Sequence, residues 1–231
     1  MAGSRAQAAE AVASGRVTVA GAPTTKPSRL VAPGEPIELL GPGPRFVSRG
    51  GDKLDAALDE FGIDVEGVRA LDAGASTGGF TDCLLQRGAS HVVAVDVGHG
   101  QLHERLLADE RVEPRDRTNV RSLDATAIGG PVDVVVADLS FISLRVAAPA
   151  LLACARPGAD LVLLVKPQFE STRREATKGK GVIRDEAVRA RVVDEVIAAL
   201  AALGAAIMGT MVSPLTGADG NVEYLVHVRK Q

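Results

Sequence analysis

Two patterns of apolar and polar positions divide the chain. From about residue 69, continuous apolar runs end in polar or glycine residues: VRALDAG, HVVAVDVG, VDVVVADLS and DLVLLVKPQFE. Between and around them lie segments of helical periodicity: DKLDAALDEFGI from about Asp52, TDCLLQRG, QLHERLLAD, LRVAAPALLACARPG and EAVRARVVDEVIAALAALG, followed by the strand-like IMGTMVSP and VEYLVHVRK. Continuous apolar strands separated by helices are typical of a mostly parallel sheet covered on both faces. The pattern predicts a doubly wound α/β fold.

The first 40 residues follow a different pattern. AQAAEAVASG predicts a helix that ends at Gly15, RVTVAG a strand, GAPTTKPSRL a turn and VAPGEPIELL a second strand. GPGPRF then has the proline and glycine density of a linker. We therefore expect a small α+β segment over residues 1–40, a linker over 41–48 and the α/β domain over 49–231.

Composition and charge refine this picture only slightly. The 231 residues are 46% hydrophobic but only 3% aromatic, so aliphatic side chains fill a sizeable core. Residues 1–49 carry a formal charge of +3 and the rest −6, and a modest basic segment supports RNA binding only weakly. No apolar run reaches the roughly 20 residues that span a bilayer, and MAGSRAQAAEAV lacks a secretion-signal core. We expect a cytoplasmic protein with no membrane partner.

Cysteine and histidine positions give no sign of a metal site. Cys83 and Cys154 lie in helix-like stretches without neighbouring ligands, so we expect two small buried side chains rather than a disulfide or a zinc site. His99 and His103 are four residues apart on an expected helix, but no third ligand is evident. The sequence therefore predicts no bound metal.

A glycine-rich turn closes the first predicted strand of the α/β domain. LDAGASTGGF, residues 71–80, does not match the dinucleotide fingerprint because Ser76 takes the place of the second glycine, and no G-K-[ST] follows. Asp96 closes the next strand about 20 residues later, where a carboxylate can accept hydrogen bonds from both ribose hydroxyls of an adenosine. This combination favours S-adenosylmethionine; the alternative is a tight turn and a strand-capping aspartate without a ligand.

The expected cofactor-binding residues are Asp72, Gly74, Ser76, Thr77, Gly78, Gly79, Phe80, Asp96 and Asn119. Asn119 lies in DRTNVRSLD, residues 116–124, which follows the third strand position. In this segment Asn119 or Asp124 is expected to bind the adenine edge, the alternative being an ordinary polar loop.

Four charged residues from distant parts of the sequence are candidates for the reacting centre. Asp138 and Lys166 end two predicted strands, Glu223 is expected on the last strand and Lys53 at the start of the first helix of the domain. A ribose hydroxyl is a poor nucleophile, so methyl transfer to it needs alignment and removal of its proton. Lys166 is the candidate general base and Lys53 the candidate for positioning the hydroxyl. Taken singly, each residue also fits a solvated charge, a cap or an edge-strand charge.

In combination, these motifs resemble a known family. VSRGGDKL, LDAGASTGGFTD, VVAVDVGHGQL, DRTN, VVADLSFISL, LLVKPQFE and GNVEYL, in this order, are similar to the TlyA family of ribosomal RNA 2′-O-methyltransferases, whose members were once also named hemolysins. The resemblance implies an FtsJ-like, Rossmann-like class I methyltransferase domain that uses S-adenosylmethionine, preceded by an S4 RNA-binding domain. It also implies a Lys-Asp-Lys-Glu tetrad at Lys53, Asp138, Lys166 and Glu223, and methylation of cytidine ribose in 23S and, in some members, 16S ribosomal RNA.

The sequence departs from the family pattern at two places. The S4 domain of the family begins with a helix of the form RLD-x-x-L-x-x-R-G-L, whereas this sequence starts at SRAQAAEAVASGRVTVAG, so we expect a partial S4 domain with weakened RNA affinity of its own. His99 stands where a tyrosine is expected, which is predicted to change packing near the methyl donor without removing a charge.

A basic stretch and three rival functions complete the expectations. STRREATKGKGVIR, directly after the predicted strand that contains Lys166, supplies cations expected to contact RNA phosphates, unless it is only a solvated loop: Arg173, Arg174, Lys178, Lys180 and Arg184. The rivals are a methyltransferase acting on another RNA or a small molecule, a membrane-active hemolysin using the apolar helix at residues 186–203, and a non-catalytic ribosome-assembly factor. The expected partners remain ribosomal RNA or ribosomal subunits.

Overall fold

The computed structural model describes residues 5–41 and 43–231. It divides into two compact units, Met1–Arg45 and Phe46–Gln231. Residues 1–4 of the expected first segment and residue 42 of the expected linker lie outside the described residues. Each unit is considered by itself below.

The smaller unit is one helix with a three-stranded antiparallel sheet. Helix α1 (Arg5–Ala13) precedes strands β1 (Val17–Val19), β2 (Ala22–Thr24) and β3 (Ile37–Leu39), and the strand order is β2-β1-β3. The expectation of a simple turn after β1 was wrong, because β2 lies within it. Ala20 and Gly21 both have positive φ (50° and 77°), the geometry of a two-residue hairpin, and this lets Ala22 pair with Val19.

The larger unit contains one seven-stranded sheet. Its strands are β4 (Arg69–Ala73), β5 (His91–Val95), β6 (Val112–Arg115), β7 (Val132–Ala137), β8 (Ala155–Val165), β9 (Ala205–Val212) and β10 (Tyr224–Lys230). They lie in the order β6-β5-β4-β7-β8-β10-β9; the first five are parallel, and β10 runs antiparallel to both of its neighbours. The prediction of a mostly parallel α/β sheet is confirmed.

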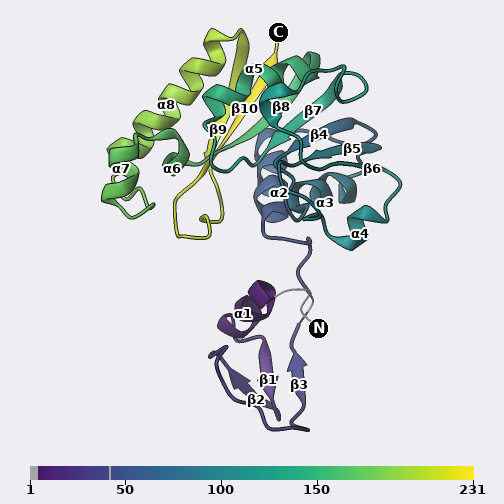
Figure 1. Cartoon of the computed structure of the whole chain (residues 1–231), viewed down its shortest axis with the longest axis vertical. Helices are drawn as coiled ribbons and strands as arrows, with labels where there is room; N and C mark the ends of the chain where they lie inside the picture. Colours follow the sequence, from purple (N-terminus) through teal and green to yellow (C-terminus); the bar gives the residue numbers. More distant parts are fainter. Residues whose placement is uncertain (1–4, 42) are drawn as a thin grey trace. The chain divides into compact units, whose positions relative to one another are not determined.

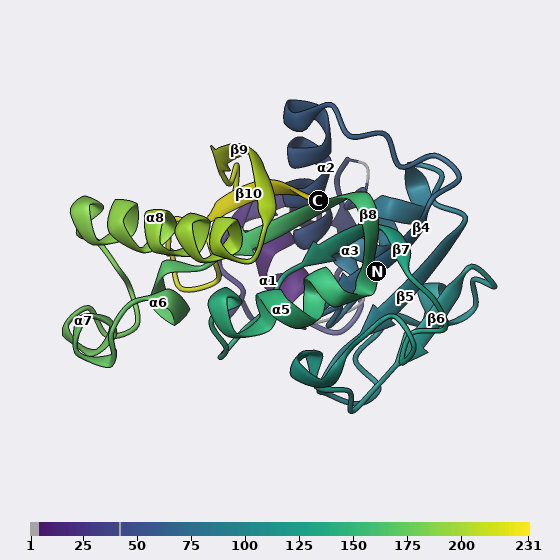
Figure 2. The same ribbon diagram turned by 90° about the horizontal axis from the view of Figure 1, so that it is seen from above.

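Helices cover both faces of this sheet, as the apolar strands require (Figures 1 and 2). On one face lie α2 (Gly50–Phe61), α3 (Gly79–Gln86) and α4 (Glu104–Leu107); on the other lie α5 (Leu144–Cys154) and α8 (Glu186–Ala202). Short helices α6 (Pro167–Glu170) and α7 (Arg173–Lys178) follow β8, and a 3₁₀ helix, η1 (Val120–Ser122), follows β6. The two hydrophobic cores lie between the sheet and these two helical layers.

Two expected helices are shorter in the structure. Only Glu104–Leu107 of QLHERLLAD is helical, so His99 and His103 do not share a helix face; His103 instead caps α4, and its ring accepts a hydrogen bond from the backbone N–H of Arg105. The preceding Gly100 has a left-handed φ of 62°, which is incompatible with a continuous helix. The expected helix through ARPG ends at Cys154 because residues from Ala155 onward pair with β7.

Two further observations concern the core and the helices. Cys83 and Cys154 are both buried and free. Across residues 5–41 and 43–231, no helix combines the length and apolarity needed to cross a membrane. The apolar residues of α8, namely Val192, Val193, Val196 and Leu200, are buried against the sheet.

Candidate active site

Sheet register explains why residues far apart in sequence meet at one edge. Parallel pairing aligns Ala73 of β4 with Ala137 of β7, so the glycine-rich turn and Asp138 leave the sheet side by side. Lys166 follows the last residue of β8 at the same edge, as expected for parallel strands. Antiparallel pairing of Tyr224 with Val165 then brings Glu223, the residue just before β10, to this edge as well.

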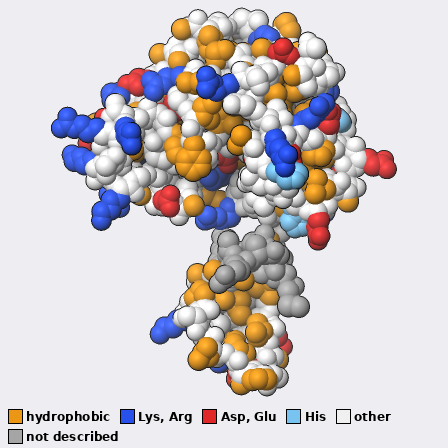
Figure 3. Space-filling model, in the orientation of Figure 1, with side chains coloured by type: hydrophobic (Ala, Val, Ile, Leu, Met, Phe, Trp, Pro, Cys, Tyr) orange, Lys and Arg blue, Asp and Glu red, His pale blue; other side chains and the backbone are white. Residues whose placement is uncertain are grey.

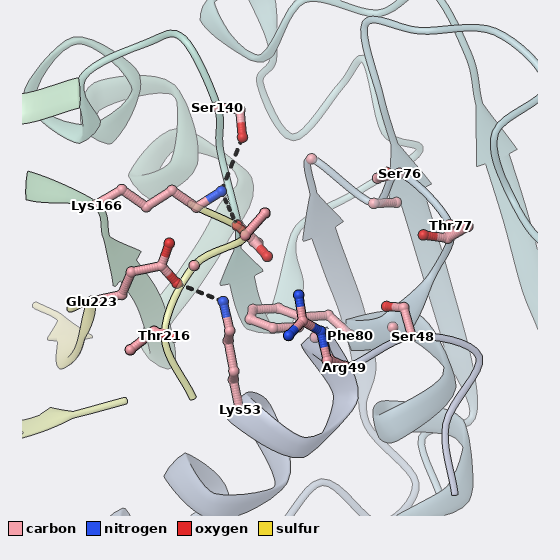
Figure 4. Close-up of a pocket in the computed structure, with 17 residues that line it drawn as sticks. Ser48, Arg49, Lys53, Ser76, Thr77, Phe80, Ser140, Lys166, Thr216 and Glu223 are labelled. Carbon is pink, nitrogen blue, oxygen red and sulfur yellow. Dashed lines mark hydrogen bonds and ion pairs between the residues drawn. The ribbon is translucent and has the colours of Figure 1, made fainter. Parts of the chain in front are cut away.

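A cavity of about 300 Å³ at this edge contains all four candidate reacting residues, and we call it the reaction cavity. It is lined by Ser48, Arg49, Gly50, Lys53, Gly74, Ala75, Ser76, Thr77, Gly79, Phe80, Asp138, Ser140, Lys166, Thr216, Gly217, Ala218 and Glu223. Figure 4 shows Lys53 extending from α2 toward Glu223, while Lys166 extends toward Ser140. The structure thus brings the four charges to the wall of one cavity.

The four charges form two ion pairs. Lys53 Nζ lies 2.5 Å from Glu223 Oε2, and the two side chains are 10% and 2% exposed. Lys166 Nζ lies 2.5 Å from Asp138 Oδ1 and also donates to Ser140 Oγ at 2.9 Å; its side chain is 12% exposed and that of Asp138 24%. The first pair is therefore nearly closed off from solvent, whereas the second is more open and has a hydroxyl as third partner.

A second cavity of about 600 Å³ adjoins the first, and we call it the cofactor cavity. It is lined by Gly74, Ser76, Val95, Asp96, Val97, Gln101, Thr118, Asn119, Val120, Arg121, Asp138, Leu139, Ser140, Phe141 and Ile142. Gly74, Ser76, Asp138 and Ser140 line both cavities. The two cavities therefore meet at the glycine-rich turn and the end of β7.

The glycine-rich turn is shaped by close packing. Gly74 has φ +86°, and a Cβ atom there would lie 2.6 Å from the backbone oxygen of Asp138. Only glycine lets the ends of β4 and β7 approach this closely, and this approach forms the shared wall. Gly78, also left-handed at φ +95°, packs where a Cβ would collide with Leu106 of α4.

Asp96 holds the far side of the turn. Its Oδ2 accepts a hydrogen bond from the backbone N–H of Ser76 at 2.8 Å, and its Oδ1 accepts one from Gly98 at 2.7 Å. Each carboxylate oxygen retains a further lone pair, because one oxygen accepts about two hydrogen bonds. The side chain therefore fixes the turn and still presents acceptors to the cofactor cavity that it lines.

Asp72 lies beneath the turn rather than on a cavity wall. Its side chain is fully buried, Thr81 Oγ1 donates to its Oδ2 at 2.6 Å, and its Oδ1 has no hydrogen-bond partner. Burial raises the pKa of Asp72 to about 7, opposed by the Thr81 hydrogen bond and assisted by the charges of Asp138 and Asp96. Neither Asp72 nor Gly78 lines the reaction cavity or the cofactor cavity.

The other expected cofactor residues lie on cavity walls. Gly74, Ser76, Thr77, Gly79, Phe80, Asp96 and Asn119 line one or both cavities. The Asn119 side chain also accepts a hydrogen bond from the backbone N–H of Arg121 and so caps η1. Asp124 does not line the cofactor cavity; it accepts a hydrogen bond from Ala127 instead.

The structure adds wall residues to which sequence reasoning gave no role. Ser48, Arg49, Gly50 and Ser140 lie inside the motifs VSRGGDKL and VVADLSFISL, so a signal existed without an assignment. Thr216, Gly217 and Ala218 belong to the loop between β9 and β10, and no motif marked them. Within the part of the chain that the structure describes, no group of three or more His, Cys, Asp or Glu residues is arranged to hold a metal ion.

Comparison with known proteins agrees with the geometry. The FtsJ-like methyltransferase family model matches residues 46–230, and the S4 domain model matches residues 1–37. These two matches define an FtsJ-like methyltransferase with an S4 domain.

Similarity to individual proteins identifies the family more closely. The chain is 50% identical, over its whole length and 86% of the relative, to the 16S/23S rRNA (cytidine-2′-O)-methyltransferase TlyA of Mycobacterium tuberculosis. It is 44% identical to the Bacillus subtilis protein YqxC, named as an rRNA methyltransferase, over 92% of the chain and 78% of the relative. A solved structure of a hemolysin-named protein from Streptococcus thermophilus superposes with a TM-score of 0.83 at 39% identity, covering 99% of this chain and 83% of that one. The chain belongs to the TlyA family.

Proposed function

We propose that this protein transfers a methyl group from S-adenosylmethionine to the 2′-hydroxyl of a cytidine in ribosomal RNA. The observation that carries the proposal is the shared wall: two lysine–carboxylate pairs line a cavity that opens directly onto a larger, cofactor-sized one. Cytidine ribose as the target follows the name of the Mycobacterium tuberculosis relative. On this proposal the enzyme works in the cytoplasm, where ribosomal RNA is found.

The cofactor cavity fits S-adenosylmethionine. Its volume lies within the range of about 300–1,000 Å³ typical of small-molecule sites. Asp96 would accept hydrogen bonds from ribose hydroxyls, Gly74 would leave room for the amino-acid portion beside the backbone, and Asn119 would hold the adenine edge. When bound, the cofactor supplies an electrophilic methyl group. Asp72, buried beneath the turn, supports the turn through Thr81.

Lys166 is the proposed general base. Asp138 and Ser140 hold its Nζ at the boundary between the two cavities, which is where the hydroxyl must meet the methyl donor. There Lys166 takes up the proton that the 2′-hydroxyl loses as its oxygen forms a bond to the methyl carbon and the bond between that carbon and the donor sulfur breaks. Lys53, held by Glu223 on the wall of the same cavity, is the proposed donor to that oxygen and would fix its direction of attack.

Contacts with RNA are proposed for a basic surface beside the site. Figure 3 shows lysine and arginine side chains gathered over the region of α7. The segment supplies Arg173, Arg174, Lys178, Lys180 and Arg184, and the first of these lies seven residues after Lys166. Lysine and arginine side chains bind phosphates and position a nucleic acid without reading its sequence. The S4 domain over residues 1–37 is the second proposed RNA contact.

Transfer of labelled methyl to unmodified 30S subunits, 50S subunits and free ribosomal RNA tests the function. We expect labelling of at least one ribosomal substrate, with the label on a ribose. Labelling only of another RNA or of small molecules would favour the rival methyltransferase, and S-adenosylmethionine binding without any transfer would favour an assembly factor. Lysis of erythrocytes by the purified protein would favour the hemolysin, although the apolar residues of α8 are already buried in the core.

A further inference from the structure

A buried carboxylate next to the site takes no part in the chemistry proposed above. Glu170 ends α6, four residues after Lys166, and is 4% exposed. Burying a carboxylate costs free energy unless it is fully hydrogen-bonded. The hydrogen-bond partners of Glu170 therefore show which segments this side chain connects.

The partners of Glu170 all belong to the start of α5. Its Oε1 accepts a hydrogen bond from the backbone N–H of Leu144 at 2.6 Å, and its Oε2 accepts one from Ser143 Oγ at 2.5 Å. Arg145 completes the set: its guanidinium lies 3.4 Å from Oε2 and donates to the Glu170 backbone oxygen at 2.7 Å. A carboxylate at the positive end of the α5 dipole is favourably placed.

These bonds join the two segments that carry the Lys166–Asp138 pair. Lys166 and Glu170 both lie in the segment that follows β8, and Asp138, Ser140 and Ser143 lie in the segment between β7 and α5. The same two segments touch a second time, where the rings of Phe141 and Phe169 lie with centroids 5.2 Å apart. We call these two sets of contacts the inter-loop contacts.

We propose that Glu170 is a positioning residue that sets the place of the Lys166 amine relative to Asp138 and Ser140. The Glu170 hydrogen bonds fix the separation of the two segments, and this separation determines whether Lys166 Nζ meets its two partners. The ring contact alone is weaker, because Phe141 is 92% exposed and its edge is open to solvent. Only the effect on catalysis rests on the proposed function; the effect on the ion pair does not.

The simpler alternative is that Glu170 only stabilises the start of α5. A substitution would then lower stability without changing the surroundings of Lys166. Asp133 offers a matched control, because it too accepts a hydrogen bond from a backbone N–H, that of Arg69 at 2.8 Å, and pairs with Arg156 at 2.6 Å. It lies near the start of β7, at the opposite end of the strand from Asp138.

Competitive acetylation of lysines, read by peptide mass spectrometry on the full chain without cofactor, tests the proposal directly. The readout is the acetylation of Lys166 divided by that of Lys53, whose own ion pair does not involve these segments. We expect Glu170→Ala to raise this ratio several-fold. Glu170→Gln, which can still accept from Leu144 and donate to Ser143, should leave it near the wild-type value, as should Asp133→Ala.

The same variants give a kinetic readout. In single-turnover methyl transfer at saturating cofactor, Glu170→Ala should be slower by about tenfold to a hundredfold, the usual cost of a misplaced catalytic group. Glu170→Gln should restore most of that rate. If the wild-type chain transfers no methyl group, the proposed function fails while the acetylation ratio still decides the role of Glu170.

Three results would overturn the proposal. The first is an unchanged acetylation ratio in folded Glu170→Ala. The second is an equal rise in Asp133→Ala, which would show a general loss of stability. The third is an equal rise in Glu170→Gln, which would show that the hydrogen bonds do not matter. Should Glu170→Ala fail to fold, Ser143→Ala, which removes one of the two bonds, must raise the ratio in the same direction, and no rise there also overturns the proposal.

Discussion

The two adjoining cavities share a wall yet differ in the chemistry of their linings. The reaction cavity contains two lysine–carboxylate pairs within about 300 Å³. The cofactor cavity is about twice as large and is lined mainly by apolar and hydroxyl side chains. Besides the shared Asp138, its charged residues are Arg121 and Asp96, and Asp96 is hydrogen-bonded to the backbone. Paired charges are thus concentrated in the reaction cavity, and apolar and hydroxyl side chains are concentrated in the cofactor cavity.

This difference separates two kinds of effect. Changes in the reaction cavity should alter the rate of the chemical step with little effect on cofactor binding, and changes in the cofactor cavity should do the reverse. Asp138 and Ser140 belong to both walls and should affect both quantities. The following variants break or sharpen this comparison.

The largest effect is expected for Lys166→Ala. Removing a general base costs about a hundredfold to ten-thousandfold in rate, so single-turnover methyl transfer should fall by about a thousandfold. The dissociation constant of S-adenosylmethionine, measured by calorimetry, should stay near the wild-type value because Lys166 does not line the cofactor cavity. A large loss of cofactor affinity together with an unchanged rate would contradict the division between the cavities.

Within the reaction cavity, Lys53→Ala should destabilise the fold more than Lys166→Ala. Removing Lys53 leaves the 2% exposed Glu223 buried without its cation, which costs about 3 kcal/mol of unfolding free energy. The Asp138 side chain is 24% exposed, so water can reach it once Lys166 is removed, and about 1 kcal/mol is expected there. Urea denaturation measures both values, and the reverse order would show that Glu223 is not the more costly partner to leave unpaired.

In the cofactor cavity, Asp96→Ala should weaken S-adenosylmethionine binding by about tenfold to a hundredfold, the cost of losing hydrogen bonds to a charged acceptor. The methyl-transfer rate at saturating cofactor should change little. Asp124→Ala is the matched control, because Asp124 lies in the same segment between β6 and β7 as Asn119 but does not line the cofactor cavity. Equal losses in the two variants would indicate a general loosening of the loops rather than a bond to the cofactor.

The smallest effect concerns Asp72 and pH. Its pKa is raised to about 7 in the folded protein from an ordinary value of 3.8, so the folded state binds this proton more tightly than the unfolded state. The associated stability is fully present below pH 3.8 and is lost as the pH rises through about 7. Relative to Asp72→Asn, the wild type should therefore lose about 1–2 kcal/mol of unfolding free energy between pH 5 and pH 6.5. If urea denaturation gives the same difference in unfolding free energy between the wild type and Asp72→Asn at both pH values, Asp72 is not a buried, protonated carboxyl.

Much of the fold could be predicted because apolar periodicity and strand length agree along the larger unit. Strands such as β7 and β8 are continuous apolar runs, and the polar residues that close them, Asp138 and Lys166, necessarily meet at one edge of a parallel sheet. The helix expected around His99 does not form there because Gly98 and Gly100 flank this residue, and Gly100 has a left-handed φ of 62°. These two glycines outweigh the short apolar pattern.

The rest of the site depends on contacts that periodicity does not contain. Lys166 donates a hydrogen bond to Ser140 only because β7 and β8 are neighbours in the sheet. Glu223 and Lys53 form an ion pair although 170 positions separate them in the sequence. Asp72 looked like a ligand because it precedes the glycine turn, but alternation along β4 turns its side chain toward Thr81 of α3. The loop residues Thr216–Ala218 have no pattern at all, since a surface loop needs none.

The central claim is that Lys166 removes the proton from a cytidine 2′-hydroxyl of ribosomal RNA. The most direct measurement is nucleoside mass spectrometry of ribosomal RNA after reaction of unmodified subunits with the wild type and with Lys166→Ala. The account predicts 2′-O-methylcytidine with the wild type and almost none with the variant, although both bind S-adenosylmethionine equally. A methyl group on a base, or equal 2′-O-methylcytidine from both proteins, would contradict it.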